Sequence, residues 1–446
     1  MANTLTAAGS RLGAPARSPS FRLLWLGQSL SLLGDGFSYI AFSWITLSLT
    51  GSTLALGYVL ACQAVPRALL TLVGGSLSDK WSSRTLMRFS SWARAALMVA
   101  VGLAGLGGAL NVWLLCGAAA AFGAVDAFFQ PARASILPSV VEKDLLPSAN
   151  ALLGVGIKVS SVLGPAVGGM VVAVTNAPVA FLVDGVCFAL CGLCVSRVRT
   201  LPPKVPAEPA GHEEPGKPEQ AGEPATHTAR EKTDGTEPVA PAPDTGNSLM
   251  ARIRAGLRYA WEDPRIRTVL VVDAAVTFCQ AGPFTVGFAT LAKTGLEGGS
   301  TTLGLLNGAL AAGAMLGTLV GGALSSRPRV GLLIAALAGW LAVGMGALGM
   351  VDSTLAALVT VFTMGFGIGF QGVFGLSWIQ RNIHGSVLSR VISVDMVIGY
   401  AVAPLSLVLC GSLARTGTDT LFAFSGVLLS LTALGVLSSR TVRGMR

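Results

Sequence analysis

A few ionisable residues of this chain lie inside long apolar runs, where a charged side chain could bind a proton or line a cavity. Asp35, Asp126, Lys158 and Asp273 each interrupt such a run. An ionised group inside a membrane-spanning helix costs about 2.5 to 3.5 kcal/mol on insertion scales, so it normally faces a bundle interior or a wet cavity. A carboxyl in that setting can take up and release a proton. These four residues are candidates for proton coupling or for lining a cavity.

The two aspartates of the first half have different neighbours along the chain. Asp35 lies about midway along its apolar run, where it could exchange a proton with a water-filled lumen. A structural ion pair, or placement near an interface, remains open for it. Asp126 lies seven residues before Arg133 and can turn toward Arg94 or Arg67. We expect these three arginines to form a fixed charge network with it.

Three further positions are less informative. Lys158 lies two turns before Gly164-Pro165, and we favour a cavity cation over a side chain that faces lipid. Asp184 has no obvious partner in the sequence. Cys191 and Cys194 have the C-x-x-C spacing, but no thioredoxin-like context or nearby histidine accompanies them, so buried filler is favoured over metal or redox chemistry.

The segments that carry these residues have the length of membrane-spanning helices. The chain has 446 residues, of which 52% are hydrophobic and 12% charged, about half the charge share of an ordinary soluble domain. Apolar residues come in blocks of about 18 to 25, which as helices cross about 30 Å of hydrocarbon. The blocks predict twelve transmembrane helices and an all-α membrane protein, at about 22–49, 54–77, 87–107, 112–131, 150–173, 178–196, 268–291, 301–325, 330–350, 354–378, 391–412 and 420–438.

The basic residues predict the orientation of these helices. All but five of the 31 lysines and arginines fall on one side, if the amino terminus is placed in the cytoplasm. The positive-inside rule therefore puts both termini in the cytoplasm of a multi-pass cell-membrane protein. The formal charge of +9 then reflects topology and attraction to anionic lipid heads rather than binding to nucleic acid.

A change of composition divides the chain into two halves. Ten of the 22 prolines fall within residues 201–250, which have almost no large apolar side chains. Such a segment cannot bury enough surface to fold, so we expect a disordered cytoplasmic linker there. The expected organisation is a disordered N-terminus at 1–20, six-helix bundles at 21–200 and 251–438, and a cytoplasmic tail at 439–446.

The two halves share matching features at a nearly constant offset. The sequence GSLSDK from Gly75 ends the second helix, and GALSSR from Gly322 ends the eighth, 247 residues later. Arg133 follows the fourth helix as Arg381 follows the tenth. This pattern predicts two pseudo-symmetric bundles, related by an axis along the membrane normal.

With these features the sequence resembles the major facilitator superfamily of secondary transporters over nearly all of the chain outside the tails and linker. The loop signature of that family stands here as Gly75, Leu77, Asp79, Lys80 and Arg84, although Ser82 replaces its usual glycine and Ser83 one of its basic residues. The second copy has lost the aspartate, at Ser326. The resemblance implies a conformational latch at Gly75, Asp79, Lys80 and Arg84 that holds the cytoplasmic side shut, with Asp79 pairing with Arg84.

A closer resemblance is to the branch that contains the enterobactin exporter and macrolide-efflux proteins. It rests on PARASILPSVVEKDLLPSANAL from Pro131 and on the glycine-proline motif GPAVGG, with Gly164, Pro165, Gly168 and Gly169. The resemblance implies the major facilitator fold and export of a hydrophobic or amphipathic small molecule, such as a drug, siderophore or secondary metabolite, by alternating access with proton antiport.

Other functions remain open or are disfavoured. An importer or facilitator of a small metabolite, and a non-transporting membrane receptor with the same fold, are the alternatives. No nucleotide-binding loop, zinc-protease motif or nucleophile elbow is present in the sequence, so we expect no enzyme, no cofactor and no metal site. The expected partners are a small-molecule substrate, protons and the lipid bilayer, and the expected state is a monomer.

Overall fold

The computed structural model describes residues 14–78, 82–200, 264–296, 298–324, 330–382 and 385–438. Within these ranges the chain forms helices and no strands, and twelve helices are long and apolar enough to cross a membrane. The predicted all-α architecture of twelve membrane-spanning helices is confirmed. The expected linker at 201–250, the tail at 439–446 and the latch residues Asp79 and Lys80 lie outside the described residues.

Six long helices form the N-terminal half, and polar residues at several of their starts fix where they begin. Asn111 and Asn176 accept from the amides of Leu114 and Val179, each at 2.9 Å, which satisfies amides that the first helical turn leaves unpaired. The helices are α2 (Pro19–Thr50), α3 (Thr53–Ser78), α4 (Ser83–Leu106), α5 (Val112–Ile136), α6 (Leu146–Val174) and α7 (Ala177–Arg197).

The first membrane helix begins inside the segment that we expected to be disordered up to residue 20. A short 3₁₀ turn, η1 (Pro15–Arg17), precedes it, and Ser18 accepts from the amide of Phe21 at 3.4 Å. Pro19 occupies the first helical position, where its missing N–H costs no hydrogen bond. These cap residues start α2 three residues before the apolar run, because capping does not require hydrophobicity.

The C-terminal half begins with a helix that changes its winding. α9 (Pro264–Gly282) continues through η4 (Pro283–Gly287), α10 (Phe288–Thr290) and η5 (Leu291–Gly295), and both η segments are π-helical. Pro283 cannot donate a backbone hydrogen bond, which accounts for the wider turn at that point. The remaining helices are α11 (Gly299–Ala323), α12 (Val330–Leu348), α13 (Thr354–Asn382), α14 (Gly385–Leu413) and α15 (Thr418–Ser438).

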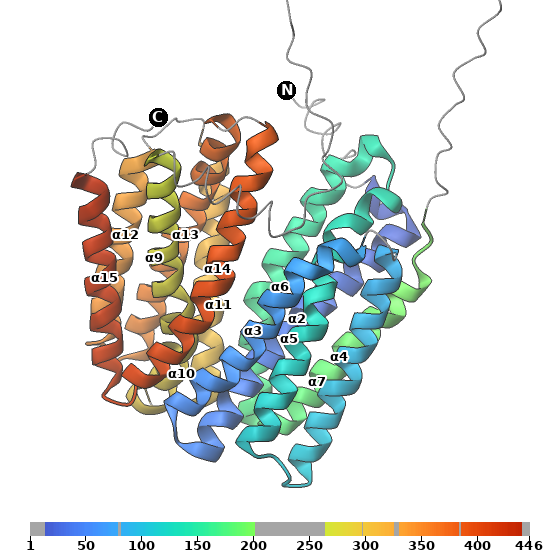
Figure 1. The fold of residues 1–446 in the computed structure, drawn as a ribbon. Helices are drawn as coiled ribbons and strands as arrows, with labels where there is room; N and C mark the ends of the chain where they lie inside the picture. The colour runs from blue at the N-terminus through green and yellow to red at the C-terminus, as the bar shows by residue number, and fades with distance from the viewer. Residues whose placement is uncertain are drawn as a thin grey trace, which may run out of the picture.

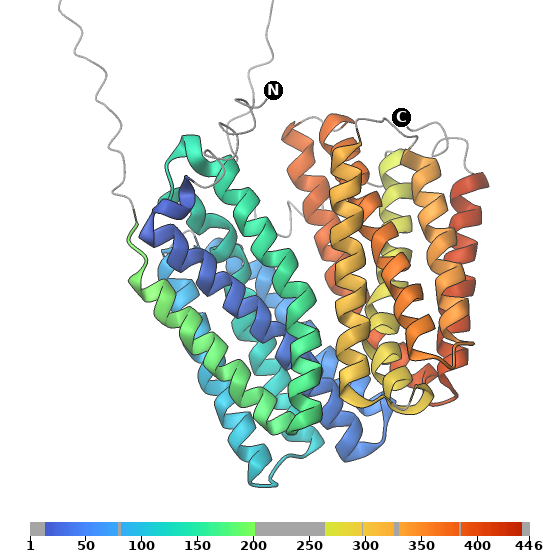
Figure 2. The same cartoon turned by 180° about the vertical axis from the view of Figure 1, so that it is seen from behind.

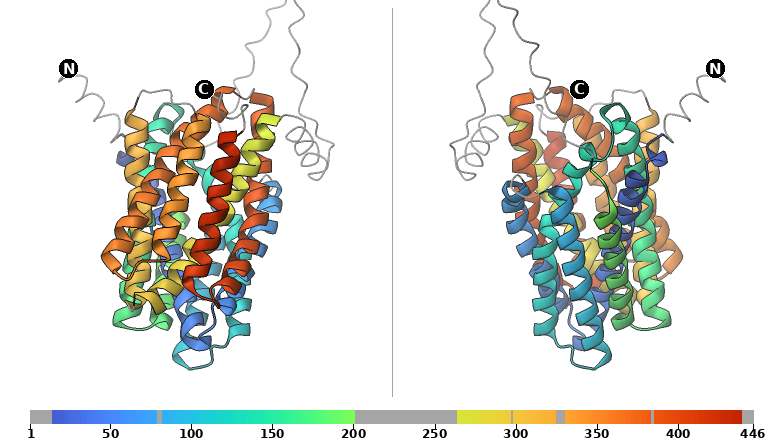
Figure 3. Two further views of the ribbon diagram at one scale, coloured as in Figure 1. Left: turned by 90° about the vertical axis from the view of Figure 1, so that its left-hand side faces the viewer. Right: turned by 90° about the vertical axis from the view of Figure 1, so that its right-hand side faces the viewer.

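The two halves stand side by side as separate bundles. Figure 1 and Figure 2 show α2 to α7 in blue to green beside α9 to α15 in yellow to red, with α2 beginning and α15 ending at the same end of the molecule. We call this end the terminus end and the opposite one the far end. Side views show the helices of both halves running between these two ends (Figure 3). α6 packs against α11, and α3 packs against α14, across the boundary between the halves.

Contacts between the halves gather toward the far end. The Thr53 hydroxyl donates to the carbonyl of Gly411 at 2.9 Å, and the Tyr39 hydroxyl donates to that of Thr285 at 3.2 Å. Lys293 donates to the carbonyl of Leu47. Each of these residues lies in the part of its helix nearer the far end, so this conformation is closed there.

Candidate functional site

Arg94 of α4 is the centre of a charge network inside the N-terminal half. Its side chain is fully buried, and its Nη1 lies 3.1 Å from Asp126 Oδ1 of α5 and 3.4 Å from Asp35 Oδ1 of α2. Its Nη2 donates to the hydroxyl of Ser31 at 3.1 Å. Because Ser31 and Asp35 are four residues apart, they share one face of α2, which they present to the same guanidinium.

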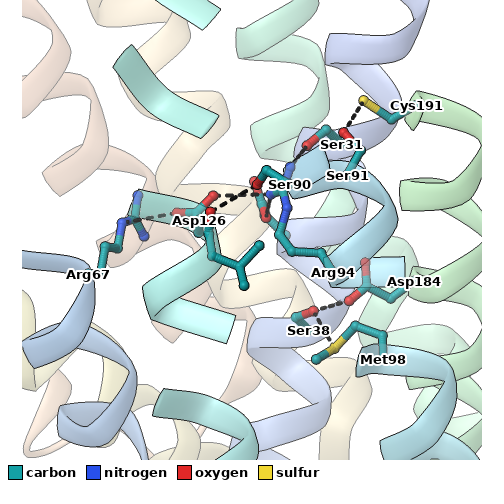
Figure 4. Close-up of polar contacts among 12 residues, drawn as sticks. Ser31, Ser38, Arg67, Ser90, Ser91, Arg94, Met98, Asp126, Asp184 and Cys191 are labelled. Atoms are coloured by element: carbon teal, nitrogen blue, oxygen red, sulfur yellow. Dashed lines mark hydrogen bonds and ion pairs between the residues drawn. The ribbon is translucent and has the colours of Figure 1, made fainter. Parts of the chain in front are cut away.

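A second arginine extends the network to a fourth helix. Arg67 Nε of α3 lies 3.1 Å from Asp126 Oδ2, so Asp126 uses both carboxylate oxygens, one for each arginine. Figure 4 shows Asp126 between the two arginine side chains. The sequence had left Arg67 and Arg94 as alternative partners of Asp126, and the structure brings both to it.

Aromatic rings enclose the Arg94 guanidinium on two sides. Its central carbon lies 4.2 Å from the ring centre of Phe129 in α5 and 4.3 Å from that of Phe188 in α7. A desolvated cation over an aromatic face gains about 2 kcal/mol. The two rings thus hold the guanidinium in place while its Nη atoms bind the carboxylates. The sequence analysis did not identify this role for either ring.

The two carboxylates differ in their access to water. The side chain of Asp126 is 3% exposed, whereas that of Asp35 is 30% exposed. Both contact the same Nη1 of Arg94. Among the described residues, a proton that neutralises Asp35 therefore leaves Asp126 as the sole anion on this nitrogen. The arrangement can convert a protonation event at an accessible carboxyl into a change of ion pairing in the interior.

Three further candidates, Arg133, Lys158 and Asp273, have other surroundings. Arg133 is half-buried near the end of α5, and its Nη1 has no hydrogen-bond partner among the described residues. Lys158 is half-buried in α6, where its backbone carbonyl accepts from Ser161 at 2.8 Å. Asp273 is half-buried in α9, where the Thr277 hydroxyl donates to its Oδ2 at 3.5 Å. Neither Arg133 nor Lys158 belongs to the ion pairs found in the described part of the chain.

The glycine-proline motif of α6 joins the charged helix α2 to the C-terminal half. A Cβ added to Gly36, the residue after Asp35, would lie 2.6 Å from the carbonyl carbon of Gly164 and 2.7 Å from Pro165 N. Gly168 packs against Phe37, and Gly169 packs against Gly304 of α11. α6 thus contacts both α11 and the segment of α2 that carries Asp35.

Of the four latch residues, two fall within the described part of the chain. Gly75 lies in the last turn of α3. Arg84 Nε donates to the carbonyl of Val195 at 3.3 Å, and its Nη2 donates to that of Ser196. These carbonyls belong to the last turn of α7, where a cation interacts favourably with the helix C-terminus. Arg84 thus has a described partner within its own half, and its expected pairing with Asp79 stays a prediction.

An apolar cavity of about 450 Å³ lies in the C-terminal half. Its lining comes from α12 and α13, and it includes Trp340, Phe362, Phe366 and Phe370, with the polar Thr363 and Gln371. The Trp340 indole donates to the Thr363 carbonyl at 3.2 Å across the two helices. The cavity lies within one half and does not touch the charge network of the other.

Sequence comparisons place these features among transporters. The chain is 25% identical over 409 residues to the multidrug efflux pump Tap of Mycobacterium tuberculosis, covering 89% of this chain and 87% of that protein. It is also 26% identical over 182 residues, 40% of this chain, to the staphyloferrin A transporter of Staphylococcus aureus, of which 45% is covered. These relatives agree with the resemblance to an efflux branch.

Structural comparison supports the same fold. The nucleoside transporter NupG superposes with a TM-score of 0.70 at 9% identity, covering 94% of this chain and 99% of that chain. Residues 24–407 match the family model described as Major Facilitator Superfamily. The match extends over both halves and most of the chain, which agrees with the expected fold and with a transporter rather than an enzyme. The chain therefore belongs to the major facilitator superfamily and is a multi-pass protein of the cell membrane.

Proposed function

We propose that this protein exports a hydrophobic or amphipathic small molecule in exchange for protons, by alternating access between its two halves. The observation that carries the proposal is the unequal exposure of the two carboxylates that share Arg94, 30% for Asp35 against 3% for Asp126. Asp35 is the group that exchanges a proton with water. Asp126 and Arg67 hold Arg94 in place and keep its charge compensated when Asp35 becomes neutral.

The contacts between the halves support a cycle of this kind. With both termini in the cytoplasm, as the basic residues predict, the conformation closed at the far end is inward-facing. Proton binding at Asp35 weakens its pairing with Arg94, and Gly36 carries that change to α6 at Gly164. Because α6 packs on α11, the two halves respond together. A ligand or proton shifts such an equilibrium only through its different affinity for the two states.

The names of the relatives support export and the substrate class. One relative is named as a multidrug efflux pump and another as a staphyloferrin A transporter, and we propose a drug or siderophore as the class of substrate here. The latch at Gly75, Asp79, Lys80 and Arg84 would hold the terminus end shut in the outward-facing state. We further propose that the protein works as a monomer, because the charge network and the main hydrophobic core are both built from residues of one chain.

Proton-driven export of ethidium from proteoliposomes tests the proposal, with the purified protein reconstituted in both orientations and an imposed pH gradient. We expect uphill ethidium movement in the wild type and its loss in Asp35→Asn, with facilitated downhill movement retained. Asp352→Asn, an exposed carboxylate in the turn between α12 and α13, is the matched control and should transport as the wild type does. Uphill ethidium movement in the same direction as the protons would support an importer, and ligand binding without any movement would support a receptor.

A further inference from the structure

Asp184 of α7 is a fully buried carboxyl outside the ion pairs described above. Its Oδ2 is in hydrogen-bond contact with the hydroxyl of Ser38 in α2, whereas its Oδ1 has no partner among the described residues. Gly34 leaves room for this carboxyl, since a Cβ added there would collide with Asp184 Oδ1. Figure 4 shows Asp184 beside Ser38 and Met98, on the far side of the Arg94 side chain from Arg67.

A count of hydrogens shows which protonation state fits this site. The Ser38 hydroxyl contacts Asp184 Oδ2 and also lies 3.5 Å from Met98 Sδ. A thioether sulfur and an ionised carboxylate both accept hydrogen bonds and donate none, and a hydroxyl has one hydrogen to give. With an ionised Asp184, one of the two contacts would lack a hydrogen. With a protonated Asp184, the acid donates to Ser38, and Ser38 donates to Met98.

A second unpaired atom lies on the same side of α4. Arg94 binds Asp35, Asp126 and Ser31 through its Nη atoms, but its Nε is buried and has no partner among the described residues. α4 and α7 run antiparallel, and their contacts follow one another along the interface. The Ser91 hydroxyl contacts the Cys191 thiol, and the Arg94 guanidinium lies over the Phe188 ring. Further along, the Ser38 hydroxyl of α2 contacts both Met98 and Asp184. Asp184 therefore lies one helical turn from the guanidinium, along the same interface.

We propose that Asp184 is a second proton-binding carboxyl of this protein, protonated in the conformation closed at the far end, and that Arg94 Nε–H becomes its partner once the proton leaves. Arg94 then stands between two carboxyl groups that compete for it, the partly exposed Asp35 and the buried Asp184. The charged or titratable groups that act on Asp184 are Asp35 of α2, Arg94 of α4 and Cys187 on its own helix.

This inference rests in part on the proposed function, because it gives the proton antiport a second proton site. Loss of a proton from Asp184 creates an anion that attracts Arg94, and that attraction weakens the hold of Arg94 on Asp35. An isolated buried anion is costly, so proton loss from Asp184 is coupled to the weakening of the ion pair between Arg94 and Asp35. The protonation state itself, however, is a property of the resting protein and can be measured without any transport.

Infrared difference spectroscopy of the purified protein tests the protonation state through the C=O stretch of a carboxylic acid. We expect one such band near neutral pH that is lost in Asp184→Asn, retained in Asp35→Asn and shifted in Ser38→Ala, where the hydrogen-bond partner is missing. Asparagine has nearly the shape of the neutral acid, so Asp184→Asn should keep the wild-type melting temperature. Should that variant fail to fold, the shifted band of Ser38→Ala carries the test. If the carboxylic-acid bands of Asp184→Asn and Ser38→Ala are the same as those of the wild type, the proposal is overturned.

Transport measurements separate this inference from the proposed function. In ethidium proteoliposome assays, Asp184→Asn should lose uphill movement and keep downhill movement. If the wild type shows no proton-driven movement while the Asp184 band is present, the proposed antiport fails and the protonated carboxyl stands. If the wild type transports uphill and Asp184→Asn does so equally well, Asp184 is not a coupling group, and the second proton site is rejected.

Discussion

Gly169 of α6 lies against Gly304 of α11, so closely that a Cβ added to Gly169 would stand 2.9 Å from the Cα atom of Gly304. A matching contact joins Gly57 of α3 to Gly411 of α14, where a Cβ on Gly411 would stand 3.2 Å from the Gly57 Cα atom. Small residues allow such close approach of membrane helices. The two contacts join the two halves at equivalent places and together close the far end.

A methyl group at the first of these contacts should open the far end. In Gly169→Ala the new Cβ meets the Ser300 and Gly304 backbone, which has little freedom to move. We expect a loss of about 1 to 3 kcal/mol of stability from overpacking, measured as a lower melting temperature in detergent, together with weaker transport. Gly154→Ala in the same helix meets no atom within 4 Å and should be neutral or slightly stabilising. Equal behaviour of the two variants would contradict the close contact.

The hydrogen bond from Thr53 to Gly411 makes a separate contribution to far-end closure. Thr53→Val keeps the side-chain shape but removes the donor, at an expected cost of about 1 kcal/mol. Hydrogen-exchange mass spectrometry should then show faster exchange at the start of α3 and the end of α14. Thr360→Val, which loses only a bond to Ala356 in the same helix, is the control and should leave those segments unchanged. Unaltered exchange in Thr53→Val would show that the bond does not contribute.

The charge network should show strong coupling between its members. Arg94→Gln leaves Asp126 and Asp35 without their shared cation, and we expect a loss of about 3 to 5 kcal/mol, as for other broken buried ion pairs. Asp126 keeps its ion pair with Arg67, whereas Asp35 loses its described cation. Adding Asp35→Asn removes this stranded anion, so the double variant should be more stable than the sum of the single losses implies. Measured interaction energies of neighbouring groups are about 0.5 to 3 kcal/mol. Additive losses would mean that the two residues act independently.

Arg88 is an exposed residue of α4, the helix that also carries Arg94 and Arg84, and its substitution is a control for those of the other two arginines. Arg88→Gln should change the melting temperature little, because substitutions of exposed side chains usually cost less than about 0.5 kcal/mol. Arg84→Gln should be intermediate, since Arg84 binds the carbonyls of Val195 and Ser196 at the end of α7. A cation at a helix C-terminus contributes about 0.3 to 1 kcal/mol. If Arg84→Gln matches Arg88→Gln, its interaction with α7 carries no stability.

The sequence by itself determined the number of helices, their order and which of them carry ionisable residues. Hydrocarbon about 30 Å thick requires apolar segments of about 20 residues, and that requirement can be read without any knowledge of packing. The glycine-proline motif and the loop signature, by resemblance, were enough to expect the major facilitator fold. The start of α2 differed because Ser18 and Pro19 act through capping, which a hydropathy pattern does not record.

The tertiary structure alone decided which charged groups meet. Helices in a membrane are apolar on their lipid face and on their packed face alike, so the pattern of hydrophobic residues does not reveal how each helix is rotated about its axis. For that reason the sequence left Asp126 with two possible partners and Asp184 with none. The packing of α2, α4, α5 and α7 brings Asp126 to two arginines, encloses Arg94 between two rings and buries Asp184 beside Ser38.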